Sequence, residues 1–203
     1  MAKSKIDLRS LIIEALLIVF TVLLALALSE WRSSIKQEET KRAVLENIIR
    51  EIQSNKEDLE SKMEYHLEMS KKLGEYVNSD SLWSTLTYSS GIEAMIQIMN
   101  KGLQNPTLQS GAWRSAELSG IVNTFDFETI LILSSVYQVQ HEGPESTWKT
   151  MAAHFGNPFS YEPKNAKLLA RMLQLGFGEL YSQERSLVYS YQNALEALAE
   201  AKE

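Results

Sequence analysis

The chain contains one stretch, residues 11–28, in which almost every side chain is apolar. Its sequence is LIIEALLIVFTVLLALAL, interrupted only by Glu14 and Thr21. A helix needs roughly 20 apolar residues to cross about 30 Å of hydrocarbon, and a helix of a soluble protein is rarely apolar on all faces over such a length. We therefore predict a transmembrane helix over residues 11–29, preceded by a short tail of residues 1–10, with the lipid bilayer as a partner.

The flanks of this stretch carry residues that are typical of a membrane interface. Arg9 precedes it, and Trp31 and Arg32 follow it, at the level where aromatic and basic side chains meet lipid headgroups. Glu14 lies about one helical turn inside the apolar limit, near enough to Arg9 to be hydrated or paired. We interpret Glu14 first as a residue of the membrane boundary. The alternative is a carboxylate of a proton or ion path, because ionisable groups inside membranes are often functional.

A cleavable signal peptide is the competing interpretation of this segment. A basic start, an apolar stretch and the small residues Ala25 and Ala27 resemble such a leader. The apolar stretch is longer than a usual leader core, and the sequence continues as a helix without a break, so we favour an anchor. Because the preceding tail is short, we expect the N-terminus in the cytoplasm and the C-terminal domain outside it.

Residues 30–78 are predicted to form one long juxtamembrane stalk helix. Apolar residues recur in it at four-three spacing, which is typical of a helix that packs along a partner. The candidate self-association seam comprises Leu45, Ile49, Ile52, Leu59 and Met63. The pattern allows pairing within the chain or between chains, so a homo-oligomer stays open. The acidic pair Glu57 and Asp58 is predicted to be solvated.

Residues 161–203 are predicted to form a second long helix, packed antiparallel on the stalk. Pro163 suits its first turn, and Gly176 with Gly178 is interpreted as a kink or a point of close packing. Its apolar seam comprises Leu173, Phe177, Leu180, Val188, Tyr191, Leu195 and Leu198.

A cap of short helices is predicted over residues 79–160. Ser90-Gly91-Ile92-Glu93 has the form of a capping box that begins a helix, and Asn105-Pro106 is expected to begin the next one. Two further short helices follow. The glycines expected to close these four helices are Gly102, Gly120, Gly143 and Gly156. Alternation typical of strands is weak throughout, so the predicted fold class is all-α.

Composition and motifs exclude several kinds of chemistry. A net charge of −6 over 203 residues argues against a nucleic-acid partner, and the absence of cysteine excludes disulfides and thiolate metal sites. His66, His141 and His154 lack the spacing of a metal site, and His66 is interpreted as structural. No nucleophile elbow or phosphate-binding glycine loop occurs. We therefore expect no cofactor, no metal and no enzymatic activity.

The order of Glu14, an apolar span, Ala25-Leu26 and Trp31, then LENIIREIQSN in a charged helix, resembles a family of short bacterial single-pass membrane proteins of unknown function. Members read Gly-Glu-Ile at the start of the span, Ala-Leu-x-x-x-x-Trp at its end and Leu-x-x-Glu-Ile/Leu-x-x-Asn further on. The resemblance covers residues 1–60 well and, through GAWRSAELSGIVNTFDFE, the remainder loosely. This chain departs from the pattern at three places: Ile13, Ala27 and Ser29-Glu30. The resemblance implies a single-pass protein of the bacterial inner membrane and no particular activity.

Three functions follow from these observations. The first is a membrane-anchored interaction or scaffold protein of the bacterial envelope, which presents its helical domain to a protein partner or to a second copy. The second is a subunit of an ion- or proton-conducting assembly that uses Glu14. The third is an envelope enzyme, which the missing catalytic motifs disfavour. We favour the first.

Overall fold

The computed structural model describes the backbone of residues 8–200 and the side chains of residues 12–199. Its regular elements are all helices, and no strand occurs within residues 8–200, so the predicted all-α class is confirmed. The chain divides into two compact units, Met1–Glu46 and Asn47–Glu203, called here the first and the second unit. Helix α1 (Leu8–Asn78) contributes to both units.

In the first unit the structure describes one element, the N-terminal part of α1. Every side chain from residue 12 to residue 40 is exposed. The backbone of this part is α-helical, so its backbone polar groups pair within the helix, and the Thr21 hydroxyl donates to the Leu17 carbonyl at 2.7 Å. We call residues 12–28 the apolar segment of α1.

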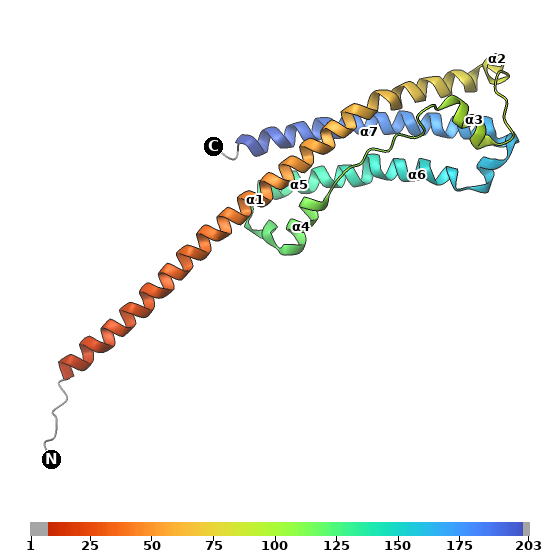
Figure 1. The fold of residues 1–203 in the computed structure, drawn as a ribbon. Helices are drawn as coiled ribbons and strands as arrows, with labels where there is room; N and C mark the ends of the chain where they lie inside the picture. The colour runs from red at the N-terminus through yellow and green to blue at the C-terminus, as the bar shows by residue number, and fades with distance from the viewer. Residues whose placement is uncertain (1–7, 201–203) are drawn as a thin grey trace. The chain divides into compact units, whose positions relative to one another are not determined.

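The second unit is built on the remainder of α1 and on α7 (Ala166–Glu200), which lie side by side (Figure 1). We call residues 47–78 the packed segment of α1. His66 contacts Glu184 at 2.8 Å, and farther along α1 a side chain on Gly74 would meet Gln174. Residue numbers therefore rise along α1 as they fall along α7, so the two helices are antiparallel, as predicted.

Shorter helices complete the second unit. They are α2 (Asp80–Trp83), α3 (Gly91–Ile98), α4 (Gly111–Ser119), α5 (Phe127–Gln140) and α6 (Ser146–Phe155), with short 3₁₀ turns at Ile121–Thr124, Pro158–Tyr161 and Pro163–Asn165. A π-helical turn, His141–Glu145, joins α5 to α6, so that these two helices follow one another along α7 (Figure 1).

The main apolar core lies where α1, α3, α6 and α7 meet. Its fully buried side chains include Leu73, Met95, Leu173, Phe177 and Leu180. A Cβ on Gly176 would lie 2.7 Å from the Met151 side chain, so glycine permits the close approach of α6 to α7 at this point. The interpretation of Gly176 as a close-packing point is confirmed.

Of the two predicted helix starts in the cap, the one at Ser90 agrees with the structure and the one at Asn105-Pro106 does not. Ser90 caps α3 by accepting from the Glu93 amide at 3.1 Å, as the capping box predicts, but the Glu93 carboxylate accepts from Ser89. The prediction that Asn105-Pro106 begins a helix is wrong, because α4 begins only at Gly111. Residues 102–110, called here the strap, instead run alongside α1 as an open segment (Figure 1).

The boundaries of the last helices, α5 to α7, also differ slightly from the predicted positions. Pro163 begins a short 3₁₀ turn, and the regular helix α7 starts three residues later. Gly143 has non-helical dihedral angles and lies within the π-helical turn, so it marks the junction of α5 and α6 rather than a clean end. Asp126 caps α5 by accepting from the Thr129 amide at 2.8 Å.

Candidate functional site

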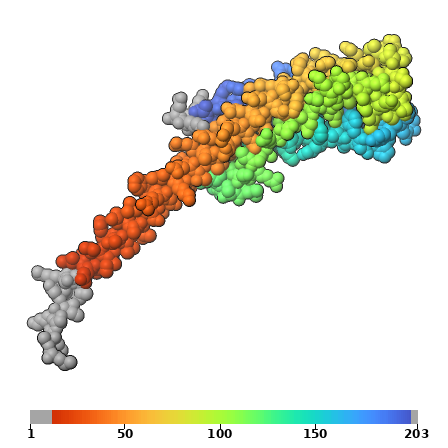
Figure 2. All heavy atoms as spheres, in the orientation of Figure 1, coloured from red at the N-terminus to blue at the C-terminus, as the bar shows by residue number. Residues whose placement is uncertain are grey.

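The most distinctive site of the second unit is a row of polar side chains on one face of the packed segment of α1. Its members follow one another at intervals of three or four residues, with the adjacent pair Tyr65 and His66 at the end of the row, so they share a helix face. They bind the backbone of the strap and of α4, which lie directly against α1 in the space-filling view (Figure 2). We call this row the ladder; it comprises Glu51, Asn55, Asp58, Lys62, Tyr65 and His66.

Glu51 forms the first step of the ladder and caps α4 from a different helix. Ser110, the residue before α4, makes no side-chain cap. The Glu51 carboxylate instead accepts from the Ala112 amide at 2.8 Å and from the Tyr137 hydroxyl at 2.7 Å. Tyr137 stacks on Trp113 with ring centroids 5.7 Å apart. Burial, and then its bond to the Glu51 carboxylate, raise the pKa of Tyr137.

Asn55 forms the second step and pairs with one residue of the strap. Its amide nitrogen donates to the Gln109 carbonyl at 2.7 Å, and its oxygen accepts from the Gln109 amide at 2.8 Å. Gln140 of α5 also donates to that carbonyl, at 3.2 Å, and accepts from the Tyr191 hydroxyl at 2.7 Å. Asn55 of α1, Gln140 of α5 and Tyr191 of α7 are nearly fully buried. Their polar groups therefore bond to one another and to the strap in place of water.

Asp58 and Lys62 form the third step. Asp58 accepts from the Thr107 amide at 2.6 Å, and Lys62 donates to the Asn105 carbonyl at 2.9 Å. The two side chains also form an ion pair at 2.6 Å. The prediction that the Glu57 and Asp58 pair is solvated is therefore correct only for Glu57, which is exposed, whereas Asp58 is half-buried under the strap.

The last step is at His66, where the side chains are completely buried. Nδ1 of His66 lies 2.8 Å from Oε2 of Glu184, and Nε2 lies 3.1 and 3.0 Å from the carbonyl oxygens of Leu103 and Gln104. Both His66 and Glu184 are 0 % exposed. The pKa of the Glu184 carboxyl is raised by burial, which outweighs the opposing effect of its bond to His66.

This arrangement explains why the strap is not helical. Backbone groups of Gln104, Thr107 and Gln109 are bonded to ladder side chains, so they are unavailable for helix formation. Proline and asparagine at the start of the strap are a local signal for a helix, and contacts with residues far away in sequence override it.

The ladder is suited to holding backbone rather than to performing a reaction. Within residues 12–199, no group of three or more histidine and acidic side chains could hold a metal ion. His66 lies in the ladder, whereas His141 lies on the surface beside Glu145, with Nδ1 3.3 Å from its carboxylate. The absence of cofactor and enzymatic activity stays a prediction.

The predicted membrane-interface residues lie on α1 in the first unit. Glu14, Trp31 and Arg32 are exposed, and Trp31 is 64 % exposed; Arg9 lies in the first turns of α1, and its side chain is outside the described residues. Within the described residues, one helix is long and apolar enough to cross a membrane, and its best window has a mean hydropathy of 2.7 with 0 % of its residues buried.

The predicted seam residues divide into two groups. Ile52 and Leu59 are 0 % exposed in the core of the second unit, whereas Leu45, Ile49 and Met63 are half-buried. Ile52 and Leu59 are thus used inside the chain, and pairing between chains through the seam stays a prediction. Sequence reasoning missed the ladder, although its polar residues repeat at the same three-or-four spacing beside the seam.

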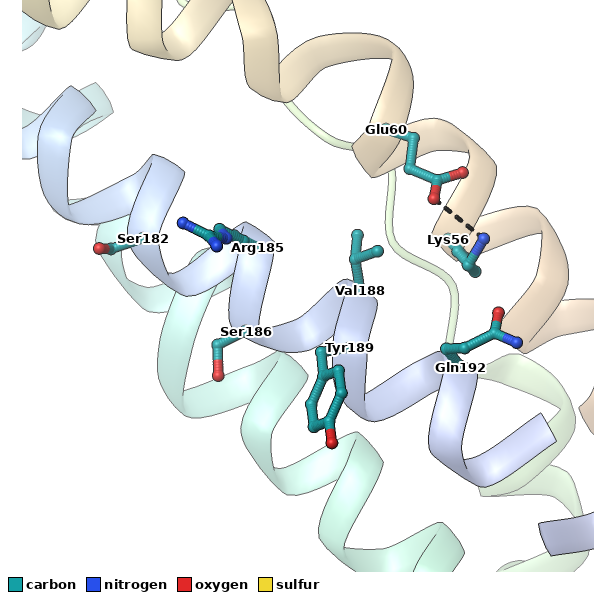
Figure 3. Close-up of a pocket in the computed structure, with 8 residues that line it drawn as sticks. All are labelled: Lys56, Glu60, Ser182, Arg185, Ser186, Val188, Tyr189 and Gln192. Atoms are coloured by element: carbon teal, nitrogen blue, oxygen red, sulfur yellow. Dashed lines mark ion pairs between the residues drawn. The ribbon is translucent and has the colours of Figure 1, made fainter. Parts of the chain in front are cut away.

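An open groove of about 730 Å³ lies along the outer side of α1 and α7 (Figure 3). On α1 it is lined by Lys56 and Glu60, which form an ion pair at 2.9 Å. On α7, Val188 points toward α1, and Tyr189, which is 69 % exposed, points away from it. The groove therefore offers both aliphatic and aromatic surface beside charged groups.

Comparison with protein families, with curated proteins and with solved structures finds no match to this chain.

Proposed function

We propose that this protein is a membrane-anchored helical interaction protein, in which the apolar segment of α1 crosses a bilayer and the second unit contacts a protein partner. The observation that carries the proposal is the exposure of the apolar segment. Large side chains such as Leu16 and Phe20 are both 65 % exposed, and the whole hydropathic window is unburied. Monomeric soluble proteins rarely expose so large a continuous apolar surface, whereas lipid covers it without cost.

The second unit supports an interaction role rather than catalysis. Buried polar groups such as Glu51, Asn55 and His66 hold α4 and the strap, and the groove leaves Val188 and Tyr189 beside charged side chains at the surface. Aromatic residues beside charged groups are common in surfaces that bind proteins. We infer the inner membrane of a bacterium as the location, with the N-terminus in the cytoplasm and the second unit outside it.

Membrane extraction of the full-length chain tests the anchor. We expect the chain to stay in the membrane pellet after alkaline carbonate treatment, and Leu17→Arg/Leu24→Arg to release it, because each arginine near the centre of a span costs about 2.5–3.5 kcal/mol on insertion scales. The matched control is Leu118→Arg/Leu131→Arg, which changes two leucines of the second unit that are 81 % and 58 % exposed. Equal extraction of both double variants would contradict the anchor.

Protease protection and cross-linking test the remaining parts of the proposal. In spheroplasts, added trypsin should cleave the second unit only if that unit lies outside the cytoplasm. Lysine-directed cross-linking of the full-length chain in its own membranes should give a discrete larger species that contains it. A chain that remains monomeric both in membranes and in mild detergent would contradict the interaction role while leaving the anchor intact.

A further inference from the structure

We propose that His66 and Glu184 form a proton-dependent latch that holds the strap closed over α1. The proposal concerns the second unit alone and does not depend on membrane anchoring. It begins from the surroundings of the His66 ring. Both ring nitrogens face acceptors, since Nδ1 lies 2.8 Å from the Glu184 carboxylate and Nε2 lies 3.0 Å from the Gln104 carbonyl oxygen.

A neutral histidine beside an ionised glutamate cannot satisfy both contacts. Neutral imidazole carries one N–H, and its second nitrogen is an acceptor. If the proton were on Nδ1, the lone pair of Nε2 would face the carbonyls of Leu103 and Gln104. If it were on Nε2, the lone pair of Nδ1 would face the carboxylate. Either arrangement leaves buried acceptors pointing at each other, which is costly where both residues are 0 % exposed.

One additional proton satisfies every contact. With that proton on Nδ1, the ring is cationic and donates to the Glu184 carboxylate and to the strap carbonyls. With that proton on Glu184, the carboxyl group donates to Nδ1, and Nε2–H still donates to the strap. The two forms differ only in the position of the proton between Nδ1 and Oε2, so the closed latch holds one proton more than neutral histidine and ionised glutamate hold separately.

The other charged groups around the latch compensate one another. On α1, Lys62 favours and Asp58 opposes ionisation of Glu184, and these two form an ion pair at 2.6 Å. Lys101, before the strap, lies over the Tyr65 ring, 5.7 Å from its centroid. Burial raises the pKa of Tyr65, so its hydroxyl stays neutral at pH values well above 7.

On α7, the neighbour of the His66 ring is uncharged. Phe177 lies 5.7 Å from it, centroid to centroid, and Oε1 of Glu184 has no hydrogen-bond partner within the described structure. The proton shared by His66 and Glu184 is therefore the one on which the contacts of this site depend.

The latch acts on the end of the strap that is held under backbone strain. Gln104 has a positive φ of 50°, a conformation that costs energy in a residue other than glycine. Its carbonyl and that of Leu103 converge on Nε2 of His66, and the Tyr65 hydroxyl donates to the neighbouring Gly102 carbonyl at 2.7 Å. Loss of the proton leaves one of the two ring contacts, to Glu184 or to the strap, without a donor, so the strained end of the strap is held less firmly and opens first.

The sign of the pH dependence follows from proton counting. In the open state, the additional proton is lost above about pH 6.5, the ordinary value for a solvated histidine, whereas the closed state needs it to satisfy every contact. Raising the pH above this value therefore favours the open state. The opening equilibrium should rise by about tenfold per pH unit until the closed latch loses its own proton.

Trypsin cleavage of the full-length chain after Lys101 measures opening, because the cleaved bond joins Lys101 to Gly102, whose carbonyl is held by the Tyr65 hydroxyl at 2.7 Å in the closed state. The reference is His66→Gln/Glu184→Gln, in which an amide can donate to the strap carbonyls without an additional proton. The ratio of wild-type to reference cleavage rates removes the pH dependence of trypsin. With cleavage slow relative to closing, we expect this ratio to rise by about tenfold per unit between pH 7 and pH 9; a constant ratio would overturn the latch.

Cleavage after Lys149, in the middle of α6, serves as the control for unfolding of the whole unit. If the Lys149 cleavage rate rose with pH as steeply as that at Lys101, the pair would govern global stability, and the strap latch would be overturned.

Nitrogen NMR of the three histidines in the wild-type chain gives a second test that needs no folded variant. His66 should remain hydrogen-bonded through both nitrogens at pH values where an ordinary solvated histidine is neutral. Loss of one of these hydrogen bonds at the pH of an ordinary histidine, with the Thr107 and Gln109 amides unchanged, would also overturn the proposal.

Discussion

The apolar and the packed segments of α1 belong to one helix and reverse the usual relation between polarity and burial. The apolar segment is exposed along its whole length, whereas the packed segment buries Glu51, Asn55 and His66 to within 8 % of full burial. Each segment is consistent with its own surroundings. The first is apolar enough to cross a membrane, and the second relies on the strap and α4 to satisfy its polar groups.

The difference shows that hydropathy alone does not locate the interior of this protein. In the packed segment, polar side chains bind the backbone of the strap and of α4 and so determine what lies against the helix. Apolar neighbours such as Ile52 and Leu59 supply the buried apolar surface. In the apolar segment, within the described residues, no side chain is covered by another part of the chain. The two segments should therefore respond differently to the same substitution, and the following predictions use that contrast.

The largest contrast is expected for leucine truncation. Leu59→Ala should lower the free energy of unfolding of the second unit by about 2–5 kcal/mol, because it leaves a cavity in the core. Leu24→Ala in the apolar segment should leave that free energy unchanged, because Leu24 is 48 % exposed. Urea denaturation of the full-length chain in mild detergent, followed by tryptophan fluorescence, measures both. Equal losses would mean that the two segments do not differ as described.

A smaller effect is expected for the ladder carboxylate. Glu51→Ala should destabilise the second unit by about 2–3 kcal/mol, because the Ala112 amide and the Tyr137 hydroxyl lose their common acceptor. Glu57→Ala removes an exposed carboxylate from the same helix and should change stability by less than about 0.5 kcal/mol. The same denaturation experiment compares them, and similar values for both variants would contradict the role of Glu51 as a cap.

Alkaline pH should weaken the packed segment through its tyrosine partners. Burial raises the pKa of Tyr137 and of Tyr191, so above pH 10 these residues ionise first in the unfolded chain. Stability should therefore fall as pH rises above 10, by about 1.4 kcal/mol per pH unit for each tyrosine. Unfolding of wild type and of Tyr137→Phe at pH 10 and pH 11 tests this. The variant should lose less stability over this interval, and identical losses would refute the assignment to Tyr137.

The smallest effect is expected at Glu14. If this residue only marks the membrane boundary, Glu14→Gln should leave carbonate-resistant membrane association and vesicle ion permeability unchanged. A Thr21→Val variant, inside the same apolar segment, is the control for altered packing in the bilayer. A loss of ion permeability in the Glu14 variant alone would favour the conducting assembly over the boundary role.

Much of the helical framework could be predicted from local signals. The Ser90 cap, the left-handed Gly120 that ends α4 and the antiparallel partnership of the long helices depend on residues that are close in sequence or on a repeated apolar pattern. The strap could not be predicted in this way, because its conformation depends on side chains 37–54 residues away, from Tyr65 and His66 to Asn55.

The candidate site was less predictable than the fold. Histidine in the ladder was interpreted as structural, and its burial agrees with that interpretation, but nothing local to His66 identifies Glu184, which is 118 residues away, as its partner. Burial of an isolated acid or of an isolated histidine costs free energy. The pairing of Glu184 with His66, which offsets this cost, can be recognised only once α7 lies beside α1.

The capping of α4 by Glu51 also has a consequence for the order of folding. Helix α4 has nine residues and no side-chain cap of its own, and isolated helices of this length are marginal in water. It should therefore become stable only after α1 has formed and presents its carboxylate. During synthesis α1 emerges long before α7, so the part of α1 that packs against α7 must remain uncovered until the last helix arrives. The interval between these events is the period in which this chain is most open to premature association.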